Sequence, residues 1–162
     1  MNKIILAIVE DDPIIQDSLR KYLSANPRIE VEFVAGSMED FLNALSVATK
    51  PALDILLLDI GLPGMSGLEG IRPLLTLVPS ANIIMLTTYE EEDKIFKALC
   101  AGAVAYLSKR TPLTKIEEAI CTVYDGGSYM SPGIARKVIS HFMPKPTEGI
   151  HALTSRQKQI VF

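Results

Sequence analysis

The stretch Ile4-Ile5-Leu6-Ala7-Ile8-Val9-Glu10-Asp11-Asp12-Pro13 sets the pattern that the rest of the chain repeats. Its first six residues are apolar and rich in β-branched side chains, which is typical of a strand buried on both faces. Three acidic residues end this strand, and Pro13 suits the first turn of a helix. We therefore expect a buried strand that passes directly into a helix, with carboxylates at the junction.

The same alternation of strand and helix recurs along the chain. Residues 29–33 alternate apolar and polar side chains, so only one face is well buried and we place this strand at a sheet edge. Apolar runs at 55–58, 83–86 and 104–107 predict three more strands, each followed by apolar residues at helical spacing. Five strands alternating with five helices predict an α/β fold, a doubly wound parallel sheet. The edge position of the second strand favours the flavodoxin-like order 2-1-3-4-5.

Composition limits the classes of protein that fit. The chain has 162 residues, of which 48% are hydrophobic and 22% charged, and this balance indicates a globular protein. A net charge of -3 gives no electrostatic footprint for nucleic acid. The apolar run at 4–9 is too short for a membrane span or a signal peptide, so we expect a cytoplasmic chain with no membrane partner. Cys100 and Cys121 are expected to be buried free thiols.

The alternation of strand and helix patterns ends after Gly127. We expect residues 1–127 to form the α/β domain and residues 128–152 to form a helix and a linker. The helix opens at Ser131-Pro132, and Pro144, Pro146 and Gly149 mark the linker. Residues 153–162 begin another helix with a capping box and end before it can pack, which predicts a truncated further domain.

Polar residues follow four of the predicted strands, and they are expected to meet at one edge of the sheet, where such folds bind ligands. These residues are Glu10, Asp11 and Asp12 after the first strand, Asp59 after the third, Thr87 and Thr88 after the fourth, and Ser108 and Lys109 after the fifth. Crowded carboxylates favour a bound cation, and oxygen ligands without His or Cys select a hard ion such as Mg²⁺. The cluster predicts Mg²⁺-assisted phosphoryl chemistry.

Each residue also has a plainer interpretation. Asp59 stands before Gly-Leu-Pro-Gly, where an Asp more often only caps a turn. Lys109 could be surface charge, Thr87 a β-former and Tyr106 part of the core. Their convergence favours the functional hypothesis, in which Asp59 is a nucleophile toward phosphorus, Lys109 pairs with a phosphoryl oxygen and Thr87 supplies a hydroxyl donor.

Together these motifs resemble the receiver domains (CheY-like) of two-component response regulators over roughly the first three quarters of the chain. The matching pieces are Val9-Glu10-Asp11-Asp12-Pro13, Leu57-Leu58-Asp59-Ile60-Gly61-Leu62-Pro63-Gly64-Met65-Ser66-Gly67, Met85-Leu86-Thr87, Gly102-Ala103, Tyr106 and Lys109. The resemblance implies that Asp59 accepts a phosphoryl group from a sensor histidine kinase or a phosphotransfer protein. It also implies that Mg²⁺ is bound by Asp11, Asp59 and the backbone carbonyl of Gly61, with Glu10 acting through water.

The resemblance further implies a switch. Thr87 moves toward the phosphoryl group, and Tyr106 turns inward into the space that Thr87 vacates. This changes the face of the fourth helix, the last strand and the fifth helix, through which receiver domains commonly dimerise. Three positions depart from the commonest pattern or vary within it, namely Gly61, Thr88 and Tyr89, and we expect them to tune the lifetime of the phosphoryl group. Asp12 is an extra carboxylate, because alignment on Pro13 assigns the acidic pair to Glu10 and Asp11.

The C-terminal part is similar to NarL-type regulators. Residues 126–132, Gly-Gly-Ser-Tyr-Met-Ser-Pro, resemble their linker, and residues 153–161 resemble the opening of a LuxR-type helix-turn-helix. Such a motif reads DNA with its second helix, which these residues do not include. We therefore expect a transcription regulator whose intact form binds DNA through a C-terminal domain, and no DNA binding by this chain alone.

Three other classes remain open. A phosphohydrolase of the haloacid dehalogenase type also uses an Asp nucleophile, but its second Asp falls at Gly61, which cannot transfer a proton. A flavin-binding module should have a loop rich in Ser, Thr and Gly where this chain has three acidic residues. A receiver-like scaffold that is never phosphorylated should lack some of these site residues, whereas this chain has all of them.

Overall fold

The computed structural model describes residues 3–48 and 52–143. Its strands are β1 (Ile4–Val9), β2 (Ile29–Ala35), β3 (Ile55–Leu58), β4 (Asn82–Thr87), β5 (Ala105–Ser108) and β6 (Tyr129–Met130). Its helices are α1 (Pro13–Ser24), α2 (Met38–Ser46), α3 (Gly67–Leu77), α4 (Glu92–Ala101), α5 (Leu113–Tyr124) and α6 (Pro132–Phe142). The expected start of a helix-turn-helix at 153–162 and the linker after residue 143 lie outside the described residues.

The sheet has the order β2-β1-β3-β4-β5-β6, and all neighbouring strands are parallel. The predicted order of the first five strands is confirmed, with β2 at the edge. The predicted number of five strands is wrong, because Tyr129 and Met130 pair with Ala105 and Tyr106 to add a sixth. A strand of two residues is too short to produce the apolar run from which the others were identified.

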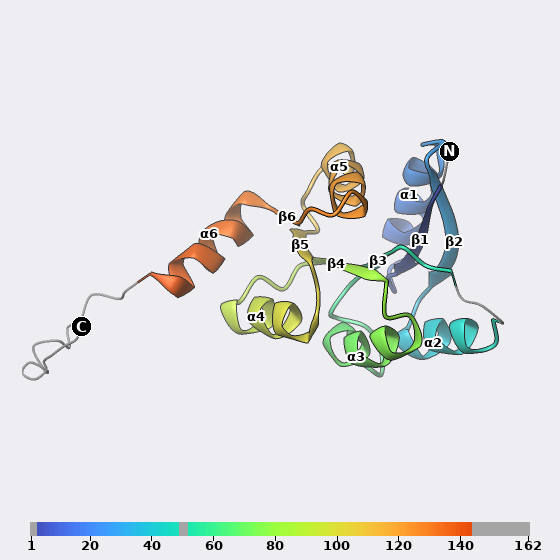
Figure 1. The fold of residues 1–162 in the computed structure, drawn as a ribbon, viewed down its shortest axis with the longest axis horizontal. Helices are drawn as coiled ribbons and strands as arrows, with labels where there is room; N and C mark the ends of the chain where they lie inside the picture. Colours follow the sequence, from blue (N-terminus) through green and yellow to red (C-terminus); the bar gives the residue numbers. More distant parts are fainter. Residues whose placement is uncertain (1–2, 49–51, 144–162) are drawn as a thin grey trace, which may run out of the picture.

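Helices cover both faces of the sheet (Figure 1). Helices α1 and α5 lie on one face, and α2, α3 and α4 lie on the other. Successive residues of β1 serve opposite faces, since Leu6 and Ile8 join the core beneath α1 and α5 while Ala7 and Val9 join the core beneath α2 and α3. This explains why the central strands are continuously apolar. Among the described residues, no helix is both long enough and apolar enough to cross a membrane.

The two cysteines differ in exposure. Both are free thiols, but Cys100 on α4 is exposed and Cys121 on α5 is only half-buried, so the expectation that both are buried is wrong for Cys100 and only partly met for Cys121. Burial raises the pKa of the Cys121 thiol, which lowers its thiolate fraction at mild pH. We expect iodoacetamide at pH 8 to alkylate Cys100 several-fold faster than Cys121, as measured by peptide mass spectrometry. In urea the two rates should converge, and faster labelling of Cys121 in the folded chain would contradict the packing of α5.

Candidate functional site

The acidic residues after β1 and β3 meet because these two strands are parallel neighbours that end together. Val9 pairs with Leu58, and the amide of Asp59 donates to the carbonyl of Val9 at 3.2 Å. Carboxylate oxygens of Glu10, Asp11 and Asp59 all lie within 4.8 Å of one another. Glu10 and Asp59 are almost completely buried, whereas Asp11 is exposed. The expected cluster therefore forms, with one carboxylate facing solvent.

Lys109 places a positive charge between two of these carboxylates. Its Nζ lies 2.7 Å from Oε1 of Glu10 and 2.7 Å from Oδ2 of Asp59. Burial alone would lower the pKa of Lys109, but its hydrogen bonds to Asp59 and Glu10 outweigh burial and raise it. Burial raises the pKa of Glu10, although the hydrogen bond and charge of Lys109 act in the opposite direction. The site is thus an acidic cluster that one ammonium neutralises in part, with Lys109 fully protonated at neutral pH.

Asp12 has a different role from its two acidic neighbours. Its Oδ1 accepts hydrogen bonds from the amides of Ile14 at 2.9 Å and Ile15 at 3.5 Å, so it caps the N-terminus of α1. Its own amide donates to Oε2 of Glu10 at 2.9 Å. Asp12 therefore stabilises the helix and orients Glu10, while the second acidic position of the cluster belongs to Asp11.

Thr87 and Tyr106 are completely buried on the adjacent strands β4 and β5. Both contact the backbone of Tyr89, because Oγ1 of Thr87 accepts from the Tyr89 amide at 3.3 Å and the Tyr106 hydroxyl donates to the Tyr89 carbonyl. Burial, helped by nearby carboxylates, raises the pKa of Tyr106, so its hydroxyl remains a donor. The expected switch residues thus hold the same loop, and Tyr106 already lies in the inward position.

Two of the residues that depart from the commonest pattern are neighbours in space. The Gly61 amide donates to Oδ1 of Asp59 at 3.4 Å. A Cβ atom added to Gly61 would lie 3.0 Å from Cε2 and 3.3 Å from the hydroxyl of Tyr89. The Tyr89 ring therefore covers the backbone beside Asp59 in the space that a side chain at position 61 would fill. Thr88, between the switch threonine and this ring, is exposed.

Gly67 allows the loop after β3 to close tightly on itself. Its amide donates to the carbonyl of Ile60 at 2.9 Å, and a Cβ atom there would lie 2.0 Å from the carbonyl oxygen of Asp59. The neighbouring atoms belong to the backbone and cannot rotate away. A side chain at position 67 must therefore displace the loop that carries Asp59.

We expect Gly67→Ala to lower the free energy of unfolding by at least about 2 kcal/mol, which is within the range for overpacked sites. Urea denaturation followed by circular dichroism measures this. Gly36→Ala is the matched control, because no atom outside Gly36 and its two chain neighbours lies within 4 Å of a Cβ added there. Equal stability of the two variants would contradict the close approach at Gly67.

Three residues that contact the site's loops were not anticipated from the sequence. Glu39 on α2 accepts from the amide of Met65 at 2.7 Å, Ser131 contacts the loop after β5, and Lys137 contacts the loop after β4. Each contact joins segments 23 or more residues apart. A single sequence contains no local signal for such pairs, although the linker-like motif at 126–132 includes Ser131.

Comparison with known proteins agrees with the fold. A family described as "Response regulator receiver domain" matches residues 6–121. The response regulator UvrY of Escherichia coli K12 is 33% identical over 156 residues, which are 95% of this chain and 70% of UvrY. The transcriptional regulatory protein YxjL of Bacillus subtilis is 32% identical over 139 residues, or 86% of this chain. This chain spans 62% of YxjL and 58% of the regulator DegU of Brevibacillus brevis.

Solved structures show the same relationship. A LuxR-family two-component response regulator from Aurantimonas is 26% identical with a TM-score of 0.78, covering 86% of this chain and 98% of its own. A CheY-like receiver domain protein from Methanospirillum hungatei is 28% identical with a TM-score of 0.68, covering 76% of this chain and 95% of its own. The family matches more than half of the chain, and UvrY is 33% identical over nearly all of it. These two findings establish the protein family of the chain. The chain belongs to the family of response regulator receiver domains, as found in LuxR-type two-component transcriptional regulators.

Proposed function

We propose that this signalling domain accepts a phosphoryl group on Asp59 in a Mg²⁺-dependent reaction with a sensor histidine kinase or a phosphotransfer protein in the cytoplasm. The observation that supports this most is the ammonium of Lys109, which lies 2.7 Å from the Asp59 carboxylate inside a cluster of three acidic residues. An acceptor needs a positioned nucleophile together with a cation for the incoming phosphoryl oxygens. Both are present at one nearly buried position.

Several residues of the chain would each have a separate role in the phosphoryl transfer. An Oδ atom of Asp59 forms a bond to phosphorus while the bond from phosphorus to the donor breaks, and the electron pair of that bond leaves with the donor. Lys109 stabilises negative charge on a phosphoryl oxygen. Thr87 turns its hydroxyl from the Tyr89 amide toward another phosphoryl oxygen. The fixed positions of β1, β3, β4 and β5 keep these groups aligned before the donor arrives.

The donor set fits Mg²⁺. All candidate ligand atoms are oxygens, and Glu10, Asp11 and Asp59 offer them within 4.8 Å of one another. Asp11, Asp59 and the carbonyl of Gly61 would hold the ion, and Glu10, which already binds Lys109, would act through water. Mg²⁺ bound there would neutralise charge on the attacking and transferred oxygens.

The output follows from the switch residues. Phosphorylation draws Thr87 toward Asp59 and holds Tyr106 inward, which changes the face formed by α4, β5 and α5. In this structure β6 pairs with β5 and α6 packs against α4, so these elements occupy part of that face. We infer that the phosphorylated form is a homodimer. In the full-length protein, residues 1–127 act as the receiver domain and residues 128–152 as the linker, and residues 153–162 open the helix-turn-helix domain that binds DNA.

The test of this function is the intact mass of the chain after incubation with acetyl phosphate, with and without Mg²⁺. We expect one phosphoryl adduct that requires Mg²⁺ and is lost in base. No adduct in any condition would favour a scaffold that works without phosphorylation. Continuous release of phosphate from small phosphate esters would favour a phosphohydrolase instead.

The Tyr89 ring should protect the phosphorylated form. Because the ring covers the backbone beside Asp59, its removal admits water to the acyl phosphate. We expect Tyr89→Ala to shorten the half-life of the adduct by about threefold, whereas Tyr89→Phe keeps the ring and should retain the wild-type half-life. Decay of the adduct mass after removal of the donor measures both. An unchanged half-life in Tyr89→Ala would contradict this role.

A further inference from the structure

Helix α6 packs against the receiver domain. Ile134 is 1% exposed and belongs to the core beneath α2, α3 and α4. The ring of His141 lies 3.9 Å from the ring of Phe96 on α4, at an angle of 33°. The helix is thus fixed beside α4, on the part of the molecule that the proposed switch changes.

Lys137 connects α6 to the loop between β4 and α4. Its Nζ donates to the carbonyl of Glu90 at 2.6 Å in a part-buried position. The preceding carbonyl, of Tyr89, accepts from the hydroxyl of Tyr106. Two successive carbonyls of one loop are therefore held, one by the switch tyrosine and one by the helix that leads out of the domain. Charged donors make stronger hydrogen bonds than neutral ones.

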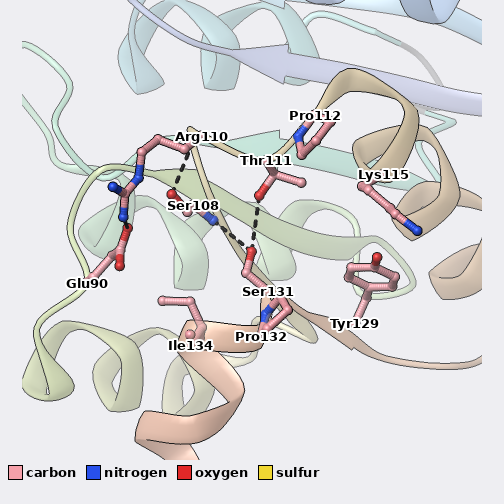
Figure 2. A pocket seen from close by; sticks show the side chains of 11 residues that line it. Glu90, Ser108, Arg110, Thr111, Pro112, Lys115, Tyr129, Ser131, Pro132 and Ile134 are labelled. Carbon is pink, nitrogen blue, oxygen red and sulfur yellow. Dashed lines mark hydrogen bonds and ion pairs between the residues drawn. The ribbon is translucent and has the colours of Figure 1, made fainter.

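Ser131 connects the start of α6 to the loop that carries Lys109. It is 8% exposed, and its Oγ accepts from the amide of Ser108 at 3.1 Å and lies 3.1 Å from Oγ1 of Thr111. Figure 2 shows Ser131 between these two residues, with both interactions drawn. Ser108 and Thr111 flank Lys109 and Arg110, so one side chain contacts both ends of this short loop.

We propose that residues 129–142 position the phosphorylation machinery and that phosphorylation of Asp59 tightens the docking of α6. Lys137 positions the loop after Thr87, and Ser131 positions the loop that carries Lys109. The inference rests on the proposed function. It adds the contacts through which phosphorylation of Asp59 would act on the linker helix α6. Coupling between two equilibria is reciprocal. If docked α6 stabilises one arrangement of the loop after β4, that arrangement of the loop also stabilises docked α6.

The direction in which phosphorylation changes the docking of α6 follows from two contacts that are present in the same arrangement of the loop after β4. Tyr106 is inward and bonded to the Tyr89 carbonyl in the same arrangement in which Lys137 holds Glu90. The proposed switch holds Tyr106 inward after phosphorylation. Phosphorylation withdraws the Thr87 hydroxyl from the Tyr89 amide but keeps Tyr106 on the Tyr89 carbonyl next to Glu90. It therefore favours the carbonyl arrangement that Lys137 binds, and α6 becomes more firmly docked rather than released.

The test uses the full 162-residue chain and four proteins: wild type, Lys137→Met, Lys137→Arg and Arg136→Met. Met removes the donor with little change in length, and Arg restores a charged donor. Arg136 is exposed on the same helix and serves as the matched control. The rate of adduct formation from acetyl phosphate is measured by intact mass, and hydrogen exchange across residues 133–142 is measured with and without the donor. Circular dichroism checks that each variant is folded.

We expect Lys137→Met to slow adduct formation by about fivefold, within the range for residues that couple two sites, while Lys137→Arg and Arg136→Met stay near the wild-type rate. Phosphorylation should slow exchange in α6 of the wild type and not in Lys137→Met. Faster exchange in phosphorylated wild type would overturn the direction, and equal rates and exchange in all four proteins would overturn the coupling. In both cases an adduct on the wild type leaves the proposed function standing, whereas no wild-type adduct removes both.

Discussion

Asp59→Asn should abolish the phosphoryl adduct of this chain and leave its fold intact. The amide of Asn is not a nucleophile toward phosphorus, whereas the Asp59 carboxylate is. Asn has nearly the same shape, and its oxygen can still accept one of the two hydrogen bonds that Asp59 receives, from the Gly61 amide or from Lys109. The variant should therefore show the wild-type circular dichroism spectrum and no mass increase with acetyl phosphate and Mg²⁺.

The matched control is Asp12→Asn, which changes a carboxylate next to the site without removing the acceptor. Asn caps helices as well as Asp does, so the capping bonds to Ile14 and Ile15 should be retained. We expect this control to form the adduct at close to the wild-type rate. An adduct that persists in Asp59→Asn would show that the acceptor is another residue, and peptide mapping would locate it.

Residues that act through strand order could be predicted from the sequence. Glu10, Asp59 and Lys109 follow strands whose apolar runs are unmistakable, and parallel strands must bring their carboxyl ends to one edge. Their meeting in the structure needs no information beyond that rule. Tyr106 was also placed correctly, because its strand is set by the same alternation.

Contacts between distant segments could not be predicted in this way. The contacts of Tyr89 with Gly61 and of Lys137 with Glu90 depend on how loops and the last helix pack, and no periodicity encodes them. The strand β6 has two residues, so its pairing depends on the neighbouring β5 rather than on its own propensity. Cys100 was expected to be buried because its sequence neighbours are apolar, but the position faces outward on α4.

Lys109→Met should have two large effects, and the first is on phosphorylation. Lys109 is the cation that contacts the acceptor carboxylate directly, at 2.7 Å. Removing one positioned donor from a site of developing negative charge costs about a hundredfold or more in rate. We expect adduct formation from acetyl phosphate to slow by at least about that factor, measured by intact mass with saturating Mg²⁺.

The second effect is on stability. The side chains of Glu10 and Asp59 are 3% and 6% exposed, and Lys109 is their shared counter-ion. Removing one partner of a buried ion pair costs about 3 kcal/mol or more, since the remaining charge is left uncompensated. We expect a loss of that size in urea denaturation at pH 7 with a metal chelator present. Lys115→Met is the control, because Lys115 forms an exposed pair with Glu118 and should contribute below about 1 kcal/mol.

The dependence on pH gives the stability effect a second signature. The pKa of Lys109 is raised above its ordinary 10.5, so its contribution to stability is complete below that pH and is lost as the pH rises through the folded-state value. The wild type should therefore lose stability above about pH 10.5 through this group, and Lys109→Met should not. Burial raises the pKa of Glu10, so protonation of Glu10 favours the folded state, and the deficit of the variant should shrink as the pH falls from 7.

Mg²⁺ distinguishes a lost counter-ion from a packing defect. If the instability of Lys109→Met arises from uncompensated carboxylates, an ion bound by Asp11 and Asp59 stabilises the folded state, and the variant should gain more from millimolar Mg²⁺ than the wild type does. A packing defect would leave the gain from Mg²⁺ equal to that of the wild type. If the variant is less stable, gains no more from Mg²⁺ than the wild type and keeps its deficit in acid, Lys109 acts through the packing of its hydrocarbon stem. If Mg²⁺ stabilises neither protein, the acidic cluster does not bind the ion.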